Sequence, residues 1–196
     1  DGLRLPRAED PASVRWVAET TGLRLQLLLE TARGLSRAAD LAAAHQQVVG
    51  LGLGEADLAA DLLVGSSNGL DWARGAVVVA SRAAGLASPV QSVWTDVADL
   101  DGLLVSCTAG LAGGFFGRSV VHPAQLSIVH DVYTPTSDAV NDARGIVATA
   151  ARAEADGEVA VLDADGRFVD AAVVARARVV LDRVPTHITA EPGGHQ

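Results

Sequence analysis

The stretch LRLQLLLETARGLSRAADLAAAHQQVVGLGLG, residues 23–54, decides how the fold of this chain is interpreted. It opens with a mostly apolar run that ends in Glu30, continues through small and apolar residues, and closes with a second apolar run at residues 48–54. Strands that are apolar along their whole length are typical of parallel sheets covered by helices. The stretch therefore predicts a strand, a helix over residues 31–47, and a second strand.

The same alternation of strand and helix continues on both sides of this stretch. Further strands are expected at residues 3–6, 89–96 and 118–123, with helical segments between them. Five such strands fit either an open doubly wound sheet or a (β/α)8 barrel. The segment GLGLGEADL, residues 50–58, resembles a dinucleotide-binding turn only superficially, because acidic residues stand where a phosphate would bind.

We expect the barrel: an α/β chain that forms the C-terminal portion of a TIM (β/α)8 barrel and lacks the N-terminal strands. The sequence has no Met and enters its first strand at once, so we expect it to begin in mid-fold. Residues 1–150 are assigned to this barrel portion. Residues 151–186 are assigned to a C-terminal extension with a hairpin around Asp165–Gly166 and a closing helix, and residues 187–196 to a flexible tail.

The composition excludes several classes of partner. The 196 residues carry a formal net charge of −9, which argues against binding to a nucleic-acid backbone. No apolar run approaches the ~20 residues of a membrane-spanning helix, and no signal-peptide pattern opens the chain. Cys107 is the single cysteine, which excludes an internal disulfide and a cysteine-built metal site. We therefore expect a cytoplasmic protein with neither nucleic acid nor membrane as a partner.

Two carboxylates follow consecutive predicted strands. Glu30 ends the first strand of the opening stretch, and Asp57 comes three residues after the second. Neighbouring strands lie about 4.8 Å apart, so the loops at their ends can converge on one ion. Carboxylates without Cys or His partners suit a hard cation, and Mg²⁺ fits best. In the other interpretation Glu30 is a helix-terminal acid favoured by the macrodipole and Asp57 is a helix cap. Glu55 is a weaker third candidate.

A second group of polar residues follows the last predicted strand, in GFFGRSVVHPAQL at residues 114–126. Arg118 is expected either to pair with a carboxylate of the barrel or to meet an anionic group of a substrate. His122 has no acid nearby in the sequence that would orient it, so a Ser-His-Asp arrangement is unsupported. A structural role beside the turn at Pro123 is expected for it.

With these residues assembled, the sequence resembles the citrate lyase β-subunit-like family, which includes the malyl-CoA and citramalyl-CoA lyases and is part of the HpcH/HpaI aldolase superfamily. The resemblance follows the order of the family's motifs over nearly the whole chain, and its last stretch is the most specific. It rests on RLPRAEDPASV (4–14), LLLETARGL (27–35), LGLGEADLAADL (51–62) and GFFGRSVVHPAQL (114–126).

The resemblance implies a TIM barrel that binds Mg²⁺ and cleaves or forms a C–C bond in a 3-hydroxyacyl-CoA such as citramalyl-CoA, malyl-CoA or citryl-CoA, with acetyl-CoA and an oxo acid as products. By position, Glu30 and Asp57 match the metal ligands of the family. Asp170 matches an acid that reaches a neighbouring subunit's active site, which implies a lid, a general acid/base acting between subunits, and a homo-oligomer, a trimer by resemblance. Alternatively, Asp170 is the N-cap of the closing helix.

An acyl-CoA substrate needs cationic or amide donors around its pyrophosphate. Because the chain is acidic overall, a local group of arginines has to supply the positive charge. Arg7 and Arg33 lie near predicted strand ends and are the candidates.

The sequence departs from the family in one respect. The early strands of the family carry an acidic D-L-E-D block and an arginine that binds the substrate carbonyl, and neither is in these 196 residues. Two other functions stay open beside the lyase. One is a pyruvate-forming class II aldolase that acts on a free 2-keto-3-hydroxy acid. The other is a non-catalytic barrel that serves as a binding or assembly subunit.

Overall fold

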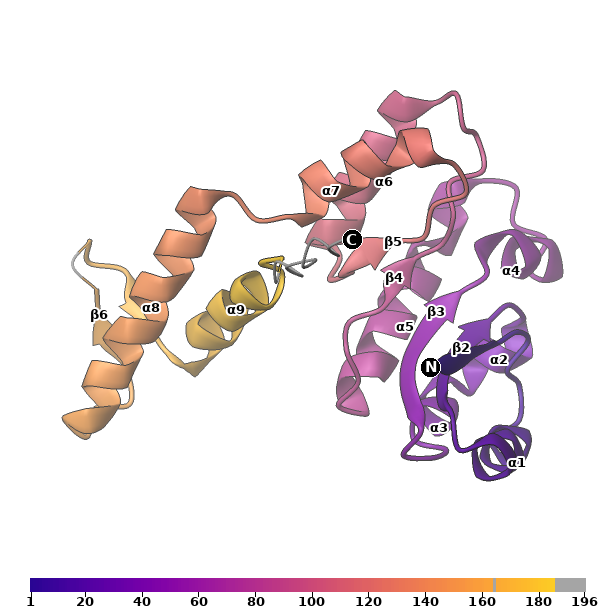
Figure 1. Cartoon of the computed structure of the whole chain (residues 1–196), viewed down its shortest axis with the longest axis horizontal. Coiled ribbons are helices and arrows are strands. Elements are labelled where there is room, and N and C mark those ends of the chain that lie inside the picture. The colour runs from indigo at the N-terminus through magenta and orange to yellow at the C-terminus, as the bar shows by residue number, and fades with distance from the viewer. Residues whose placement is uncertain (164, 186–196) are drawn as a thin grey trace, which may run out of the picture. The chain divides into compact units, whose positions relative to one another are not determined.

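The computed structural model of the chain describes residues 1–163 and 165–185 (Figure 1). The chain divides into two compact units, Asp1–Val132 and Tyr133–Gln196. The first unit holds a parallel sheet with its helices, and the second holds two helices joined through a hairpin. Within the described ranges, no helix is long and apolar enough to cross a membrane.

The first unit is built on a five-stranded sheet in which every neighbouring pair of strands is parallel. The strands stand side by side in the order in which they follow one another in the chain. A doubly wound sheet reverses its strand order at a switch point, and the five described strands contain no such reversal. The five predicted strands are confirmed as β1 Gly2–Leu5, β2 Arg24–Leu29, β3 Val48–Leu53, β4 Val90–Gln91 and β5 Gly117–Arg118.

Helices connect the consecutive strands. The first of them, α1, begins after Asp10, whose side chain accepts a hydrogen bond from Ser13 N at 3.0 Å. It ends at Gly22, which takes a left-handed φ of 63°. The helices up to the unit boundary are α1 Pro11–Thr21, α2 Ala32–Ser36, α3 Ala38–Ala42, α4 Glu55–Asp61, α5 Asp71–Ala83, α6 Leu100–Ala112 and α7 Leu126–Tyr133, with 3-10 turns η1 Ser67–Leu70 and η2 Pro123–Gln125.

The single helix predicted over residues 31–47 is wrong, because α2 and α3 are separate and the second of them ends at Ala42. Arg37 stands at the break with a φ of −108° and a ψ of 16°. Its guanidinium donates to Glu9 O at 3.1 Å and pairs with Asp10 at 3.5 Å. These tertiary contacts hold the chain at a point where local periodicity would continue the helix.

The two faces of the sheet differ in burial. On β2 the side chains of Leu25, Leu27 and Leu29 are fully buried. Successive strand residues point to opposite faces, so Gln26 and Leu28 point to the other face, where they are only half-buried. The first face forms the apolar core of the unit, and the second face is left with room for polar side chains.

Glycines of β3 create that room. The register places Gln26 beside Gly50 and Leu28 beside Gly52. A Cβ added at Gly52 would lie 3.2 Å from Leu28 Cδ2, closer than ordinary van der Waals contact. The GLGLG run at residues 50–54 therefore serves the packing of neighbouring strands.

β4 keeps only two residues of the predicted range 89–96, and β5 shares only Arg118 with the predicted range 118–123, so most of these two predictions is wrong. Beyond the two strands, side chains replace the backbone ladder. Gln125 donates through Nε2 to Trp94 O at 2.8 Å, and its Oε1 accepts from Val121 N at 3.1 Å. A buried amide thus bridges the two segments that were expected to continue as strands.

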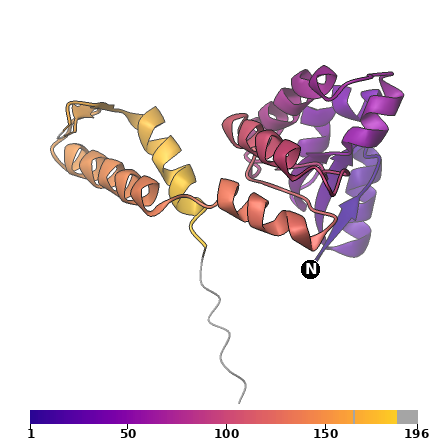
Figure 2. The same cartoon turned by 90° about the horizontal axis from the view of Figure 1, so that it is seen from above.

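The second unit consists of two helices that pack side by side, with a two-stranded antiparallel hairpin between them in the chain (Figure 2). The hairpin predicted around Asp165–Gly166 is confirmed, and its glycine takes a φ of 75°. The predicted boundary at residue 150 falls inside the first helix, and the predicted tail of residues 187–196 lies outside the described residues. The elements are α8 Ser137–Ala155, β6 Val161–Leu162, β7 Phe168–Val169 and α9 Ala171–Asp182.

Candidate metal and substrate site

Glu30 and Asp57 border one cavity of about 210 Å³. Glu30 directly follows β2, and Asp57 lies in the first turn of α4, which begins two residues after β3. Active sites of parallel α/β folds lie at this end of the strands. The rest of the wall comes from the half-buried face of the sheet and the loops at its ends, namely Arg4, Gln26, Leu28, Gly52, Leu53, Gly54, Glu55, Ala56, Val90, Gln91, Ser92, Val93 and Ser119.

The carboxylate of Glu30 is held from two sides. Its Oε2 accepts a hydrogen bond from Arg7 N at 2.9 Å. Arg7 takes a left-handed φ of 47°, which costs a residue other than glycine about 1 kcal/mol. On the other side, a Cβ added at Gly54 would lie 2.6 Å from Glu30 Oε1 and 2.9 Å from Cδ. The backbone amide of Arg7 and the absence of a side chain at Gly54 therefore determine together where this carboxylate lies.

Asp57 is exposed and has no hydrogen-bond or ion-pair partner among the described residues. The N-cap position of α4 is Gly54, and no side chain caps the helix. The alternative that Asp57 caps α4 is therefore wrong. The helix dipole still favours an acid in this turn, but the carboxylate remains available to a ligand.

Glu55 is engaged elsewhere. Its carboxylate forms an ion pair with Arg74, and each of these side chains is only 20% exposed. Arg74 also donates to Asp71 at 2.7 Å and to Ser67 O at 3.1 Å. The side-chain hydrogen bond to Glu55 raises the pKa of Arg74 above its ordinary value. Glu55 therefore neutralises a neighbouring arginine, which makes it a poor third metal ligand.

The donor set fits Mg²⁺ better than a transition metal. In the part of the chain that the structure describes, no group of three or more His, Cys, Asp or Glu side chains could hold a metal ion. Magnesium is commonly bound by one or two carboxylates, with water and substrate oxygens as its other ligands. Two oxygen donors on one cavity, one of them fixed by Arg7 N, meet that requirement.

Arg7 and Arg33 come together on a different cavity, of about 310 Å³, beside β1 and α1. Arg7 pairs with Glu9 at 3.7 Å, and its side chain is 69% exposed. Arg33 is exposed and has no partner among the described side chains. Both arginines thus line one cavity, whose wall also carries acidic residues.

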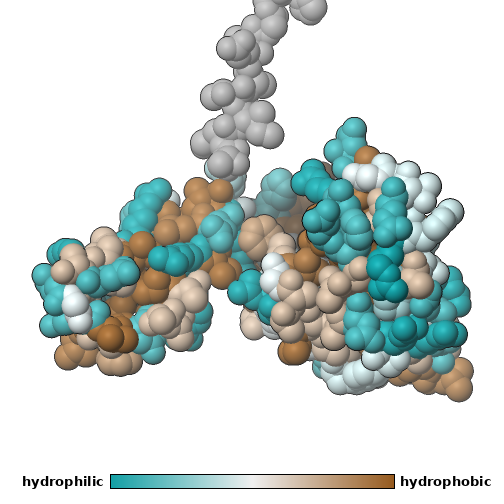
Figure 3. Space-filling view, turned by 90° about the horizontal axis from the view of Figure 1, so that it is seen from below, coloured by the Kyte–Doolittle hydropathy of each residue, from teal (hydrophilic) through white to brown (hydrophobic). Residues whose placement is uncertain are grey.

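Asp170 lies in the second unit. Its Oδ1 accepts from Val173 N at 2.9 Å, so it is the N-cap of α9. It also lines a groove of about 450 Å³ between α8, the hairpin and α9. Apolar surface follows this groove (Figure 3). The alternative that Asp170 caps the closing helix is confirmed.

Sequence reasoning missed Gln125. Its side chain is fully buried, and it joins the loop after β4 to the loop after β5. His122, nearby, accepts from Ala124 N through Nδ1 at 3.2 Å, so its expected structural role is confirmed. The available signal for Gln125 was an uncharged polar residue two positions after Pro123, just before an apolar helix.

A family model described as HpcH/HpaI aldolase/citrate lyase matches residues 4–123. The chain is 32% identical to citrate lyase subunit beta of Escherichia coli K12, over 79% of this chain and 52% of that protein. It is 33% identical to (3S)-malyl-CoA thioesterase of Cereibacter sphaeroides, over 92% of this chain and 64% of that protein. The chain thus spans between about half and two thirds of the length of these curated relatives.

Among solved structures, the chain is similar to CitE from Mycobacterium tuberculosis in complex with magnesium, acetoacetate and coenzyme A. The TM-score is 0.73 at 30% sequence identity, and the match covers 93% of this chain and 67% of that one.

Proposed function

Because the chain belongs to the HpcH/HpaI aldolase/citrate lyase family, we propose that it is part of a Mg²⁺-dependent carbon–carbon lyase. The predicted family resemblance is thereby confirmed. The proposed substrate is a 3-hydroxyacyl-CoA such as citramalyl-CoA, malyl-CoA or citryl-CoA, and the products are acetyl-CoA and an oxo acid. The observation that carries the proposal is the convergence of Glu30 and Asp57 on one cavity at the ends of β2 and β3.

The proposed architecture is a TIM barrel of which β1 to β5 are consecutive strands. The sequential, all-parallel order of the sheet supports it. So does the difference between the two faces, because barrel strands bury one face under helices and turn the other toward the barrel axis. In this arrangement Gln26 and Leu28 belong to the interior layers.

Glu30 and Asp57 are the residues that would hold the metal. Bound there, Mg²⁺ would act as a Lewis acid toward the substrate hydroxyl and its adjacent carboxylate. The protein positions the two metal ligands. Arg7 N holds Glu30 through Oε2, and Gly54 leaves space for the carboxyl group of Glu30. Asp57 has no competing side-chain partner among the described residues.

Cleavage also needs a proton at carbon. The substrate hydroxyl loses its proton to solvent and becomes the carbonyl of the oxo acid. As the bond between this carbon and the thioester α-carbon breaks, its electron pair passes to the acetyl-CoA enolate. We assign delivery of the enolate's proton to Asp170, from a neighbouring subunit. One oxygen of Asp170 caps α9, and the other has no partner in the described part of the chain. The proposed assembly is accordingly a homo-oligomer, a trimer by family resemblance.

Arg7 and Arg33 are the proposed contacts for the CoA pyrophosphate. They share one cavity, and Arg33 has no competing partner among the described side chains. The proposed setting is the cytoplasm, with acyl-CoA as the ligand and neither nucleic acid nor membrane as a partner. The net charge of −9 supports this choice against nucleic acid.

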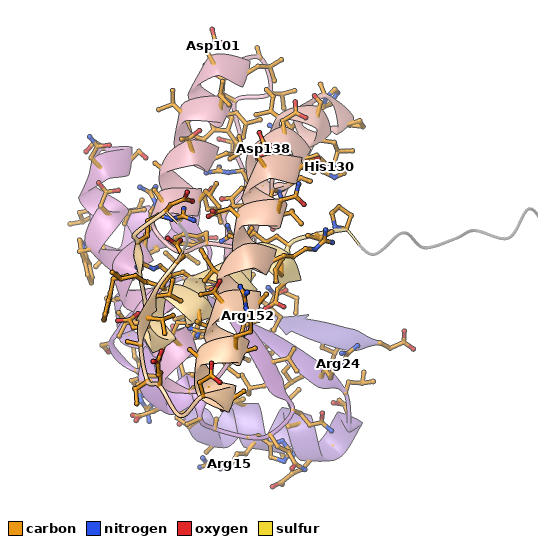
Figure 4. All side chains as sticks on the ribbon, turned by 90° about the vertical axis from the view of Figure 1, so that its left-hand side faces the viewer. Arg15, Arg24, Asp101, His130, Asp138 and Arg152 are labelled. Carbon is orange, nitrogen blue, oxygen red and sulfur yellow. The ribbon has the colours of Figure 1, made fainter. Side chains whose placement is uncertain are left out.

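The test is the Asp57→Asn substitution in the full-length protein. Cleavage of malyl-CoA and citramalyl-CoA should fall about a hundredfold or more, and Mg²⁺ binding measured by calorimetry should weaken in parallel. Asp101→Asn is the matched control, since Asp101 is also an exposed acid in the first turn of a helix, at the N-terminal end of α6 (Figure 4). Unchanged turnover and metal affinity in Asp57→Asn would remove Asp57 from the mechanism. Binding of CoA alone separates the acyl-CoA lyase from a pyruvate-forming aldolase.

A further inference from the structure

We propose that Arg118 binds an oxyanion in a second cavity of the first unit, separate from the Glu30–Asp57 site. This cavity measures about 360 Å³ and is bordered by α4, α5, α6 and the segments at the ends of β4 and β5. Glu55 and Ser92 border both cavities, so the two sites are neighbours. The proposal needs neither the metal nor the lyase reaction.

The guanidinium of Arg118 is fixed but not saturated. Its Nη2 donates to Ser106 Oγ at 2.6 Å, and its Nε donates to Gln91 Oε1 at 3.3 Å. Its Cζ lies 5.6 Å from the ring centroid of Trp94, within the range of a cation–π contact. The thiol of Cys107 is a third neighbour that interacts with the guanidinium. A guanidinium has five N–H donors, so donors remain for a ligand beyond the contacts with Ser106, Gln91 and Cys107.

The charge of Arg118 is also uncompensated. No carboxylate in the described ranges forms an ion pair with it, although it is half-buried. Arg74 on the same cavity is different, because Glu55 and Asp71 both pair with it. A desolvated cation with neutral neighbours is unfavourable unless an anion approaches it. Of the two arginines that line this cavity, Arg118 is therefore the one without an ion-pair partner among the described residues.

Asp96 is the other acid on the wall. It is exposed, and its Oδ1 accepts from Ala98 N at 3.1 Å and from Asp99 N at 3.2 Å. Its carboxylate is thus turned to backbone amides of its own loop, which leaves the Arg118 donors unopposed.

The ligand that matches these donors is a carboxylate or a phosphate group. Arginine binds both through pairs of parallel N–H···O bonds, and a ring stacked on the guanidinium holds it in one orientation. The hydroxyls of Ser66 and Ser67 on the same cavity can add hydrogen bonds. Both candidate ligands are oxyanions, so we assign the site to an oxyanion. The experiment decides between carboxylate and phosphate.

The test is a titration of the full-length protein with inorganic phosphate and, separately, with acetate at constant ionic strength, followed by tryptophan fluorescence. Trp94 is the reporter because it stacks on Arg118. A saturable change is expected with one of the two anions, and the responding anion identifies the source. In Arg118→Gln the affinity should fall about tenfold.

The matched control is Arg15→Gln, which removes the same charge from the exposed surface of α1 (Figure 4) and should leave the affinity unchanged. Arg118→Lys keeps the charge but loses the paired geometry, so it should bind several-fold more weakly than the wild type. Thermal unfolding confirms that each variant is folded. Absence of saturation with both anions, or wild-type affinity in folded Arg118→Gln or Arg118→Lys, overturns the proposal.

Discussion

The two halves of the sheet are held together in different ways. β2 and β3 pair along most of their length, from Leu25–Val48 to Leu29–Leu53. β4 and β5 pair only through Val90–Gly117 and Gln91–Arg118. The first half rests on a backbone ladder over buried leucines, and the second half rests on polar side chains that bridge loops. The half that carries the proposed metal ligands is therefore the half with the longer backbone ladders.

The two halves of the sheet have different roles in the cavities described above. Glu30 and Asp57 have to converge on one point, and a long parallel ladder fixes the ends of neighbouring strands relative to each other. The loops after β4 and β5 instead form the rim of two cavities, and Gln125 joins them without a ladder. Four predictions test this comparison.

The largest effect is expected in the buried ladder. Leu27→Ala removes a fully buried side chain and should destabilise the first unit by about 3 kcal/mol, because the cavity left behind cannot collapse completely. Urea unfolding followed by tryptophan fluorescence is the measurement, since all three tryptophans lie in this unit. Leu63→Ala is the control, at a residue that is 91% exposed. Equal effects of the two substitutions would contradict the role given to the ladder.

Loss of the Gln125 side chain, which bridges the loops after β4 and β5, should destabilise the unit less than loss of Leu27. Gln125→Ala leaves Trp94 O and Val121 N without their partner, which should cost about 2 kcal/mol in the same unfolding experiment. Gln46→Ala, at an exposed glutamine, is the control and should be neutral. A neutral Gln125→Ala would mean that the two loops do not depend on this amide.

A methyl group at Gly54 should act on the metal site. The added Cβ would displace the carboxylate of Glu30, so Mg²⁺ affinity measured by calorimetry should fall about tenfold in Gly54→Ala. Gly65→Ala introduces a Cβ that meets nothing within 4 Å and serves as the control. If Gly54→Ala binds Mg²⁺ as the wild type does, Glu30 is not held in the way proposed.

The smallest expected effect is on the stability of the fold at low pH. The backbone amide of Ser13 lowers the pKa of Asp10 below its ordinary value of 3.8. The folded state then favours the charged form, so its stabilisation is present above that value and is lost as the pH falls through the lowered pKa. Asp10→Asn keeps an acceptor at the cap of α1 but removes this titration.

Unfolding of Asp10→Asn should therefore depend slightly less on pH below about 4 than unfolding of the wild type. Asp40→Asn, at an exposed acid without a cap hydrogen bond, is the control. An identical pH dependence in the wild type and Asp10→Asn would argue against the cap. The bridging side chains of the second half, Gln91 and Gln125, are neutral amides and contribute no such dependence.

The split helix and the short strands mark the limits of local patterns. A helix through residues 31–47 satisfies the spacing of apolar residues, yet Arg37 turns to Glu9 and Asp10 and interrupts it. β4 ends at Gln91, and beyond it the carbonyl of Trp94 accepts from the side chain of Gln125 and not from a neighbouring strand. In both cases a partner far away in the sequence outweighs a weak local preference.

The amino-acid sequence by itself determined the alternation of strand and helix and the two acids that follow consecutive strands. These depend on periodicity and on neighbours along the chain, which a sequence displays directly. Only the tertiary structure decided that Gly54 leaves space for Glu30, that Arg74 neutralises Glu55, and that Arg118 meets no carboxylate in the described ranges. Each of these depends on which side chains meet across strands and loops distant in sequence, and such pairings arise only when the sheet assembles.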